Sequence, residues 1–157
     1  EEKTQDPDKR NTGLFFFKGT PGAKFAVCNA GGGFAYVGAM QDSFPHALEL
    51  SKLGYNAFAL IYRPSAQDAC QDLARAIDFI FEHAEELEVD TSNYSLWGGS
   101  AGGRMAAWVA SYGTAAFGGD DLPMVDDHAA LGADDAVQHI PQLLRQVDQF
   151  LHRPAGA

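Results

Sequence analysis

The chain has 157 residues, of which 46% are hydrophobic and 20% are charged. A chain of this length buries roughly two thirds of the surface that it would expose when unfolded, which is enough for one globular domain with its own core. Asp and Glu number 21 against 11 Lys and Arg, which gives a formal net charge of -10. This acidity repels phosphate backbones and anionic headgroups, so binding to nucleic acid or to a membrane surface is not expected.

The sequence contains no apolar run of the roughly 20 residues that cross a bilayer, and its polar start lacks the apolar stretch of a signal peptide. We therefore expect a soluble protein, either cytoplasmic or secreted after removal of a signal peptide. The two cysteines, Cys28 and Cys70, are too few for a disulfide framework, and we interpret both as structural thiols.

Short apolar runs separated by turns occupy the first third of the chain. Strands are predicted at Leu14–Phe17 and Phe25–Asn29, and the second strand leads into three consecutive glycines, Gly31–Gly33. Three glycines after a strand indicate a sharp turn or a close approach of the backbone to another group. Helical spacing then predicts a helix over Ser43–Leu53, which Gly54 ends.

The middle of the chain continues to alternate between strands and helices. The nearly unbroken apolar run Tyr55–Tyr62 predicts a strand buried on both faces, and Ala66–Leu87 has the periodicity of an amphipathic helix. A turn at Asp90–Asn93, a strand at Tyr94–Trp97 and a helix over Met105–Tyr112 are predicted to follow. This alternation is typical of an α/β fold with a mostly parallel sheet.

The composition changes after Gly113. Six aspartates surround one short apolar stretch, Leu122–Val125, which predicts at most one strand. The chain closes with an amphipathic pattern that predicts a helix beginning near Ile140, because Pro141 is tolerated only in a first turn.

The segment Gly98-Gly99-Ser100-Ala101-Gly102 has the form G-x-S-x-G and lies between a predicted strand and a predicted helix. In this context the motif indicates a nucleophilic serine on a sharp turn, with its hydroxyl clear of the sheet. Small residues are needed at Gly98 and Gly102 because a side chain there would collide with the turn. The alternative is a glycine-rich turn that serves only packing.

A serine nucleophile needs donors for the negative charge that develops on the substrate carbonyl oxygen, and each missing donor raises the barrier by about 3 to 4 kcal/mol. The glycine-rich loop after Asn29 can supply such N–H groups, and Ala101, directly after the serine, can supply another. A phosphate-binding loop is the competing interpretation. The sequence lacks both G-x-x-x-x-G-K-[ST] and a G-x-G-x-x-G motif with its accompanying acidic residue.

Four segments together resemble α/β-hydrolases of the bacterial esterase and lipase kind, close to the acetyl-esterases or xylanase-associated esterases with a glycine-rich oxyanion loop. The resemblance covers about Lys3–Gly119 and implies a three-layer α/β/α sandwich with the site at the carboxyl ends of the strands. It implies Ser100 as the nucleophile, and the N–H groups of Gly32, Gly33 and Ala101 as oxyanion donors. The segments are NAGGGF, YNAFALIYRP, DLARAIDFI and YSLWGGSAGG.

The general base is expected among the histidines that follow the serine, as in the chain order of this family. His128 follows the one late strand and resembles the catalytic histidine of the family's last-strand loop, so we predict it as the base; an exposed loop histidine is the alternative. His139 and His152 lie before and inside the terminal helix, where a solvated face explains them. His46 and His83 belong to the helices that cover the sheet.

The triad acid is predicted at Asp126, with Asp120, Asp121 and Asp127 as alternatives. For each of these carboxylates, a solvated loop position or a helix cap is the competing interpretation. A dyad without the acid still catalyses, because loss of the orienting carboxylate costs about 10⁴ in rate while the oxyanion hole persists.

The chain is short for this family. A complete relative carries two further strand and helix units between the nucleophile helix and the last strand, and the 28 positions from Ser100 to His128 cannot hold them. The resemblance therefore implies a truncated α/β-hydrolase fold that lacks about two late strand-helix units. We expect a single domain, with a hydrolase body at residues 1–119 and a shortened histidine loop and terminal helix at residues 120–157.

The leading hypothesis is a serine carboxylesterase that hydrolyses short-chain acyl esters through an acyl-enzyme. Its expected partner is a small acyl ester, and no metal or organic cofactor is implied. The second hypothesis is a truncated, weakly active or inactive hydrolase module that persists as a homo-oligomer. Removing strands from one side leaves the nucleophile strand near an exposed sheet edge, and such edges pair with other chains.

Overall fold

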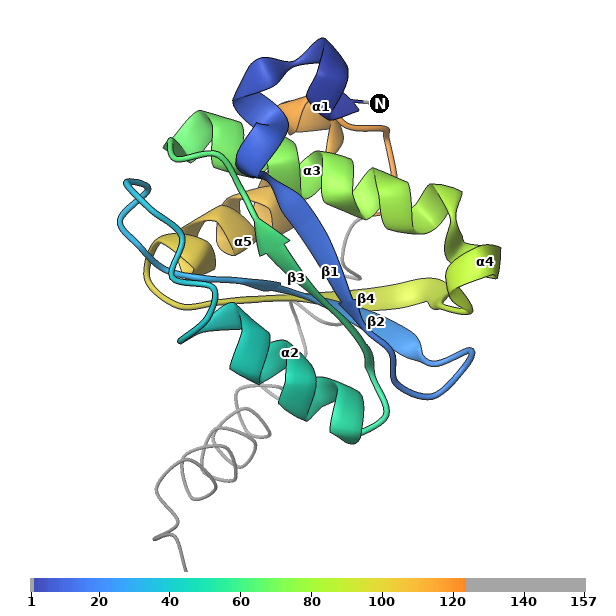
Figure 1. Ribbon diagram of the computed structural model, residues 1–157. Coiled ribbons are helices and arrows are strands. Elements are labelled where there is room, and N and C mark those ends of the chain that lie inside the picture. Colours follow the sequence, from blue (N-terminus) through green and yellow to red (C-terminus); the bar gives the residue numbers. More distant parts are fainter. Residues whose placement is uncertain (1, 124–157) are drawn as a thin grey trace, which may run out of the picture. The chain divides into compact units, whose positions relative to one another are not determined.

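The computed structural model describes residues 2–123 (Figure 1). None of the helices in this described part is long and apolar enough to cross a membrane. The elements, in chain order, are α1 (Glu2–Gln5), η1 (Pro7–Asn11), β1 (Gly13–Phe17), β2 (Lys24–Asn29), α2 (Ser43–Lys52), β3 (Asn56–Ile61), α3 (Ala66–Glu82), α4 (Ala84–Leu87), β4 (Asp90–Gly98), α5 (Ala101–Tyr112) and η2 (Ala115–Phe117).

The four strands form one sheet in the order β1-β3-β2-β4. β2 pairs in parallel with β3 on one side and with β4 on the other, whereas β1 pairs antiparallel with β3. The central strands β2 and β3 are buried along nearly their whole length, as expected for strands covered on both faces. The predicted mostly parallel α/β sheet is therefore confirmed.

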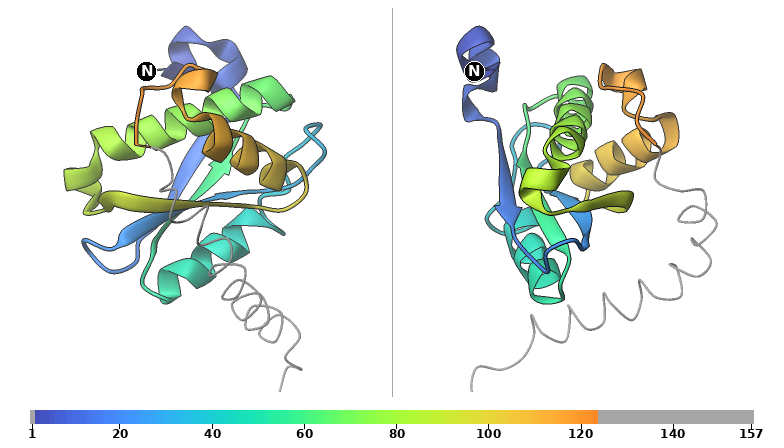
Figure 2. Two further views of the ribbon diagram at one scale, coloured as in Figure 1. Left: turned by 180° about the vertical axis from the view of Figure 1, so that it is seen from behind. Right: turned by 90° about the vertical axis from the view of Figure 1, so that its right-hand side faces the viewer.

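Helices cover both faces of the sheet. Successive side chains of a strand point to opposite faces, and the residues of β2 and β3 that face α2 are small, which lets this helix pack closely. On the other face, the ring of Phe25 in β2 packs edge-on against Phe81 of α3, with centroids 6.0 Å apart. α3 and α5 lie side by side on that face (Figure 2). The core cluster under α2 consists of Ala26, Cys28, Ala47, Leu50, Ala57 and Ala59.

The predicted continuous helix Ala66–Leu87 is wrong at its carboxyl end. α3 stops at Glu82, because His83 has φ -111° and ψ 19° and so leaves the helical region, and the short helix α4 follows. The imidazole of His83 packs against the ring of Phe79, with centroids 4.2 Å apart. Leu87 lies beyond the break at His83 but still falls at the apolar spacing of the preceding helix. Hydrophobic periodicity therefore could not locate the break.

The predicted turn at Asp90–Asn93 is also wrong, since these residues belong to β4. Lys24 pairs with Asp90 while the next residue, Phe25, pairs with Tyr94, so the ladder contains an irregularity at this point. The Asp90 carboxylate accepts hydrogen bonds from the N–H and the hydroxyl of Ser92, at 2.8 and 2.9 Å. Asp90 and Ser92 therefore form the side-chain hydrogen bonds typical of a turn, but they do so inside an irregular strand.

The strand predicted at Leu122–Val125 has no counterpart at Leu122 and Pro123, which are not in regular structure, and its remainder lies outside the described residues. The helix predicted from Ile140 also lies outside them. The division of one domain into a body at residues 1–119 and a following segment at residues 120–157 stays a prediction.

Candidate active site

The two glycine-rich loops leave the sheet next to each other. Asn29, the last residue of β2, pairs with Gly98, the last residue of β4. Neighbouring strands lie about 4.8 Å apart, so the loops that follow start at nearly the same place. A Cβ built on Gly31 would lie 3.2 Å from the Ser100 Cβ. The structure therefore brings the predicted oxyanion loop into contact with the predicted nucleophile.

Ser100 occupies a strained turn between β4 and α5. Its φ of 51° and ψ of -117° are sparsely populated for a residue with a side chain, and its side chain is exposed. A Cβ on Gly98 would lie 2.3 Å from the carbonyl carbon of Gly102, and one on Gly102 would lie 2.0 Å from the carbonyl oxygen of Asn29. Both positions require glycine, for the steric reason predicted from the motif.

The first loop owes its shape to two glycines with different constraints. Gly32 has φ 142°, and a Cβ on it would lie 2.0 Å from the carbonyl oxygen of Tyr36. Gly33 has φ 62°, and a Cβ built on it would meet no atom within 4 Å. Glycine is therefore favoured at this position by the backbone conformation and not by a close contact. The loop then closes with two hydrogen bonds to the Gly32 carbonyl oxygen, from the N–H groups of Ala35 and Tyr36 at 3.0 and 3.2 Å.

Within residues 2–123, the N–H groups of Gly32, Gly33 and Ala101 have no hydrogen-bond acceptor. Ala101 is the first residue of α5, where backbone N–H groups have no partner inside the helix. The N–H group of Gly31, by contrast, donates to Asp42 Oδ2 at 2.8 Å. The three residues predicted as oxyanion donors are thus ones whose N–H groups are not used by the described part of the chain.

A buried tyrosine that the sequence analysis did not single out holds the start of this loop. Tyr62, only 2% exposed, donates its hydroxyl to the Ala30 carbonyl oxygen at 2.5 Å. Burial, and to a lesser degree the charge of Asp42, raise the pKa of Tyr62 to about 12. The hydroxyl therefore keeps its proton and its role as donor throughout the neutral range.

Asp42 and His46 are further neighbours of the loop that were not predicted at the site. Asp42 Oδ1 lies 3.2 Å from His46 Nδ1, one helical turn further along α2. The signal in the sequence was an aspartate directly before the helix starting at Ser43, which indicates only an N-cap. Its contact with Gly31, 11 residues earlier, depends on the tertiary fold.

Asp120 and Asp121, two of the alternatives for the triad acid, follow the far end of α5 from Ser100. The Asp120 carbonyl oxygen accepts from Thr114 Oγ1 at 2.6 Å, and its N–H group lies 3.2 Å from both carboxylate oxygens of Asp78. α5 has 12 residues. Such a helix is about 18 Å long, so the structure does not bring Asp120 to the serine end of α5.

The other predicted catalytic residues, His128, Asp126 and Asp127, lie outside the described residues. So do His139 and His152. Their roles stay predictions.

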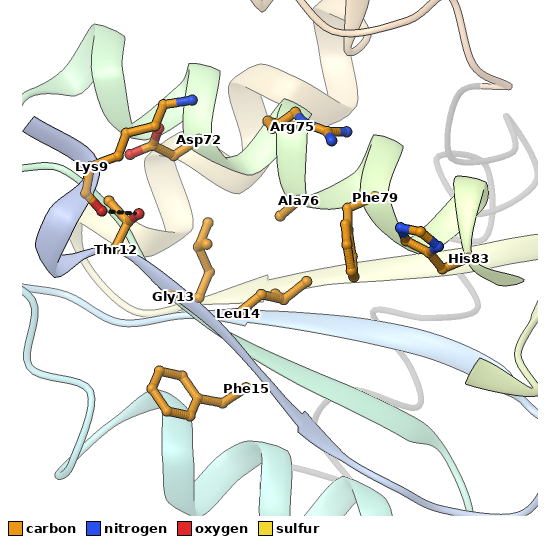
Figure 3. Close-up of a pocket in the computed structure, with 11 residues that line it drawn as sticks. Lys9, Thr12, Gly13, Leu14, Phe15, Asp72, Arg75, Ala76, Phe79 and His83 are labelled. Carbon is orange, nitrogen blue, oxygen red and sulfur yellow. Dashed lines mark hydrogen bonds between the residues drawn. The ribbon is translucent and has the colours of Figure 1, made fainter. Parts of the chain in front are cut away.

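A surface cavity of about 700 Å³ lies between the η1–β1 segment and α3 (Figure 3). None of the predicted site residues lines it. Two of its polar side chains serve local structure: Thr12 donates to the Lys9 carbonyl oxygen at 2.8 Å, and the Asp72 carboxylate binds Arg63. No group of three or more potential metal ligands occurs in the part of the chain that the structure describes.

The turn at Ser100 and the glycine-rich loop both fall inside a match to a protein family. The family model BD-FAE matches residues 18–131. The chain belongs to the BD-FAE family. A search of curated proteins found no match for this BD-FAE chain.

Solved structures similar to this BD-FAE chain include esterases. A thermophilic esterase from Thermogutta terrifontis, Est2, is 29% identical with a TM-score of 0.58, over 63% of this chain and 39% of that one. The same esterase phosphonylated by cyclosarin is 27% identical, with a TM-score of 0.58 over 63% of this chain and 41% of that one. The fold is shared by an acetyl ester-xyloside bifunctional hydrolase from Caldicellulosiruptor lactoaceticus. This hydrolase is 24% identical, with a TM-score of 0.57 over 64% of this chain and 38% of that one.

These matches confirm the resemblance to α/β-hydrolases of the esterase kind and the α/β fold that it implied. The chain spans about two fifths of the length of the esterase structures.

Proposed function

We propose that this BD-FAE chain acts as a serine carboxylesterase on short-chain acyl esters. The observation that carries the proposal is the contact between the exposed Ser100, on its strained turn, and the glycine-rich loop at Gly31. The short acyl group is proposed by extension from the T. terrifontis esterase, which has been solved with butyrate and with propionate bound.

In the proposed reaction, Ser100 Oγ forms a bond to the ester carbonyl carbon while His128 accepts the hydroxyl proton. The resulting tetrahedral intermediate collapses, the bond to the alcohol breaks, and His128 returns the proton to the departing alcohol oxygen. Water then attacks the acyl carbon while His128 again accepts a proton. The bond between the acyl carbon and Ser100 Oγ breaks, His128 returns the proton to Ser100 Oγ, and the carboxylic acid leaves. Asp126 is the proposed residue that orients His128.

The proposed oxyanion hole consists of the N–H groups of Gly32, Gly33 and Ala101. Two features support it: these donors have no acceptor within residues 2–123, and Ala101 opens α5, where the helix dipole favours negative charge. Each donor of this kind stabilises the transition state by about 3 to 4 kcal/mol.

For the acid, Asp126 is favoured over Asp120 and Asp121, which follow the opposite end of α5 from Ser100. Asp127 is directly next to His128 in sequence, and a neighbouring carboxylate seldom reaches the imidazole of the following residue. Asp126→Asn is expected to lower kcat by up to about 10⁴.

The test is covalent labelling of the 157-residue chain with a fluorophosphonate, followed by peptide mass spectrometry and an assay with p-nitrophenyl acetate. We expect one adduct, on Ser100, and ester turnover that Ser100→Ala abolishes. Ser111→Ala, which changes an exposed serine on the same helix, is the matched control and should keep both properties. Absence of an adduct together with absence of turnover overturns the proposal.

A second candidate is an oligomeric module of low activity. Among the described strands, β4 has a single neighbour, β2, so one side of the nucleophile strand is an edge. Such edges pair with a second chain. Sizing by light scattering tests this candidate: a dimer whose activity disappears on dilution supports it, and a strict monomer with full esterase activity rejects it.

A further inference from the structure

Asp42 occupies the N-cap position of α2 without capping it. An aspartate at this position normally accepts a hydrogen bond from an N–H group of its own helix, which stabilises the helix by about 1 kcal/mol. The Asp42 side chain makes no such bond, and the residue has φ -123° and ψ -83°. Its carboxylate therefore does not satisfy the backbone N–H groups at the start of the helix that it precedes.

The carboxylate instead lies between the two glycine-rich loops. Oδ2 accepts the N–H of Gly31 at 2.8 Å, and a Cβ built on Gly99 would lie 3.2 Å from the same oxygen. Oδ1 lies 3.2 Å from Nδ1 of His46. The side chain of Asp42 is 26% exposed, so it is mostly shielded from competing water. One oxygen therefore accepts a hydrogen bond from the loop, while the other lies beside His46 of α2.

We propose that Asp42 is a positioning residue for the esterase reaction. Its bond to Gly31 fixes the amino end of the loop against the Ser100 turn, so that the next two N–H groups, of Gly32 and Gly33, face the reacting carbonyl. This inference rests on the proposed function, because it concerns the donors of that same oxyanion hole. Tyr62 donates to the carbonyl oxygen of Ala30 and Asp42 accepts from the N–H of Gly31, so both sides of the one peptide group that joins these residues are held.

The hydrogen bond, and not the negative charge, is the useful property of Asp42. A carboxylate close to the reacting carbonyl opposes the charge that develops on its oxygen, because like charges repel. Asparagine keeps the size and an acceptor oxygen for Gly31 but carries no charge. Asp42→Asn should therefore retain the activity that Asp42→Ala loses, whereas a catalytic carboxylate would lose activity in both variants.

The experiment compares the 157-residue chain with its Asp42→Ala and Asp42→Asn variants. The rate of Ser100 labelling by the fluorophosphonate should fall about tenfold or more in Asp42→Ala and stay within about threefold in Asp42→Asn. In ester assays the loss in Asp42→Ala should appear in kcat with little change in KM. Amide hydrogen exchange at Gly31 should accelerate about tenfold in Asp42→Ala only.

Ser65→Ala is the matched control, because Ser65 Oγ caps α3 by accepting the N–H of Asp68 at 3.0 Å. It should lower the melting temperature without changing the labelling rate. Labelling and Gly31 exchange that are both unchanged in Asp42→Ala overturn the inference, as does equal loss in both Asp42 variants. An unlabelled parent chain overturns the proposed function, whereas the exchange measurement still reports on Asp42 by itself.

Discussion

Gly102 in the first turn of α5 lies directly against Asn29 at the end of β2, so that a Cβ on Gly102 would come within 2.0 Å of the Asn29 carbonyl oxygen. This contact seats the start of α5 on the neighbouring strand. Since Ser100 immediately precedes α5, the same contact determines where the serine stands relative to the glycine-rich loop.

Gly102→Ala is expected to push α5 away from β2 and to destabilise the fold by about 2 kcal/mol or more. The Ser100 labelling rate should fall with it, measured on protein that is still folded. Gly38→Ala is the matched control, because a Cβ there has its nearest neighbour at an ordinary 3.5 Å. Equal stability and labelling of the two variants would contradict the role of the contact.

Backbone strain at Ser100 predicts a difference between two inactive variants. Alanine at this position keeps the unfavourable positive φ of 51°, whereas glycine adopts it readily. Ser100→Gly should therefore be more stable than Ser100→Ala by about 1 kcal/mol. Denaturation by urea measures the difference, and a less stable glycine variant would argue against strain in the turn.

The ion pair between Arg63 and Asp72 should contribute more to stability than surface pairs do. Arg63 Nη2 lies 2.8 Å from Asp72 Oδ1, with side chains 16% and 5% exposed, and the Arg63 N–H also donates to Asp72 at 2.8 Å. Hydrogen bonding to Asp72 is the main cause that raises the pKa of Arg63.

Asp72→Ala is therefore expected to cost about 3 kcal/mol, because it leaves a mostly buried guanidinium without its main partner. Glu82→Ala, which removes an exposed partner of Arg75, should change the free energy of unfolding by less than about 0.5 kcal/mol. Chemical denaturation of both variants checks the contrast, and similar losses would disprove it.

The buried thiol of Cys28 predicts alkaline lability. Burial, followed by the charge of Asp42, raises the pKa of Cys28 from 9.0 to about 12. Below pH 9 the thiol is protonated in both the folded and the unfolded chain and has no effect. Between pH 9 and 12 the unfolded chain releases the proton and the folded one keeps it, so stability falls as pH rises.

The loss from this one group approaches about 1.4 kcal/mol per pH unit. Cys28→Ala should show a shallower decline in the free energy of unfolding between pH 9 and 11 than the parent chain, although its stability at pH 8 is lower. Parallel declines for the two proteins would show that Cys28 does not cause the effect.

Prediction from the sequence succeeded where the signal is local. The apolar run at Tyr55–Tyr62 contains β3, the spacing after Asp42 gave α2, and the small residues around Ser100 indicated the strand-turn-helix arrangement. Each of these features depends on residues that are close together in the chain.

Features that depend on distant pairing were missed. β4 starts at Asp90 because Asp90 pairs with Lys24. The segment Asp90–Asn93, whose residue types are typical of a turn, is therefore part of a strand. The break at His83 lacks a glycine or proline to mark it. Asp42 and Tyr62 hold the glycine-rich loop through contacts that only the folded chain creates.

The irregular pairing of β2 and β4 has a consequence for changes in chain length. The irregularity lies between Lys24 and Phe25, at the amino ends of the two strands, whereas Asn29 and Gly98 pair in regular register next to the candidate site. Residues inserted within positions 91–93 can enlarge the irregular region and leave the serine in place. An insertion between Tyr94 and Gly98 shifts the register and turns alternate side chains to the opposite face, so tolerance to insertion should change abruptly along this one strand.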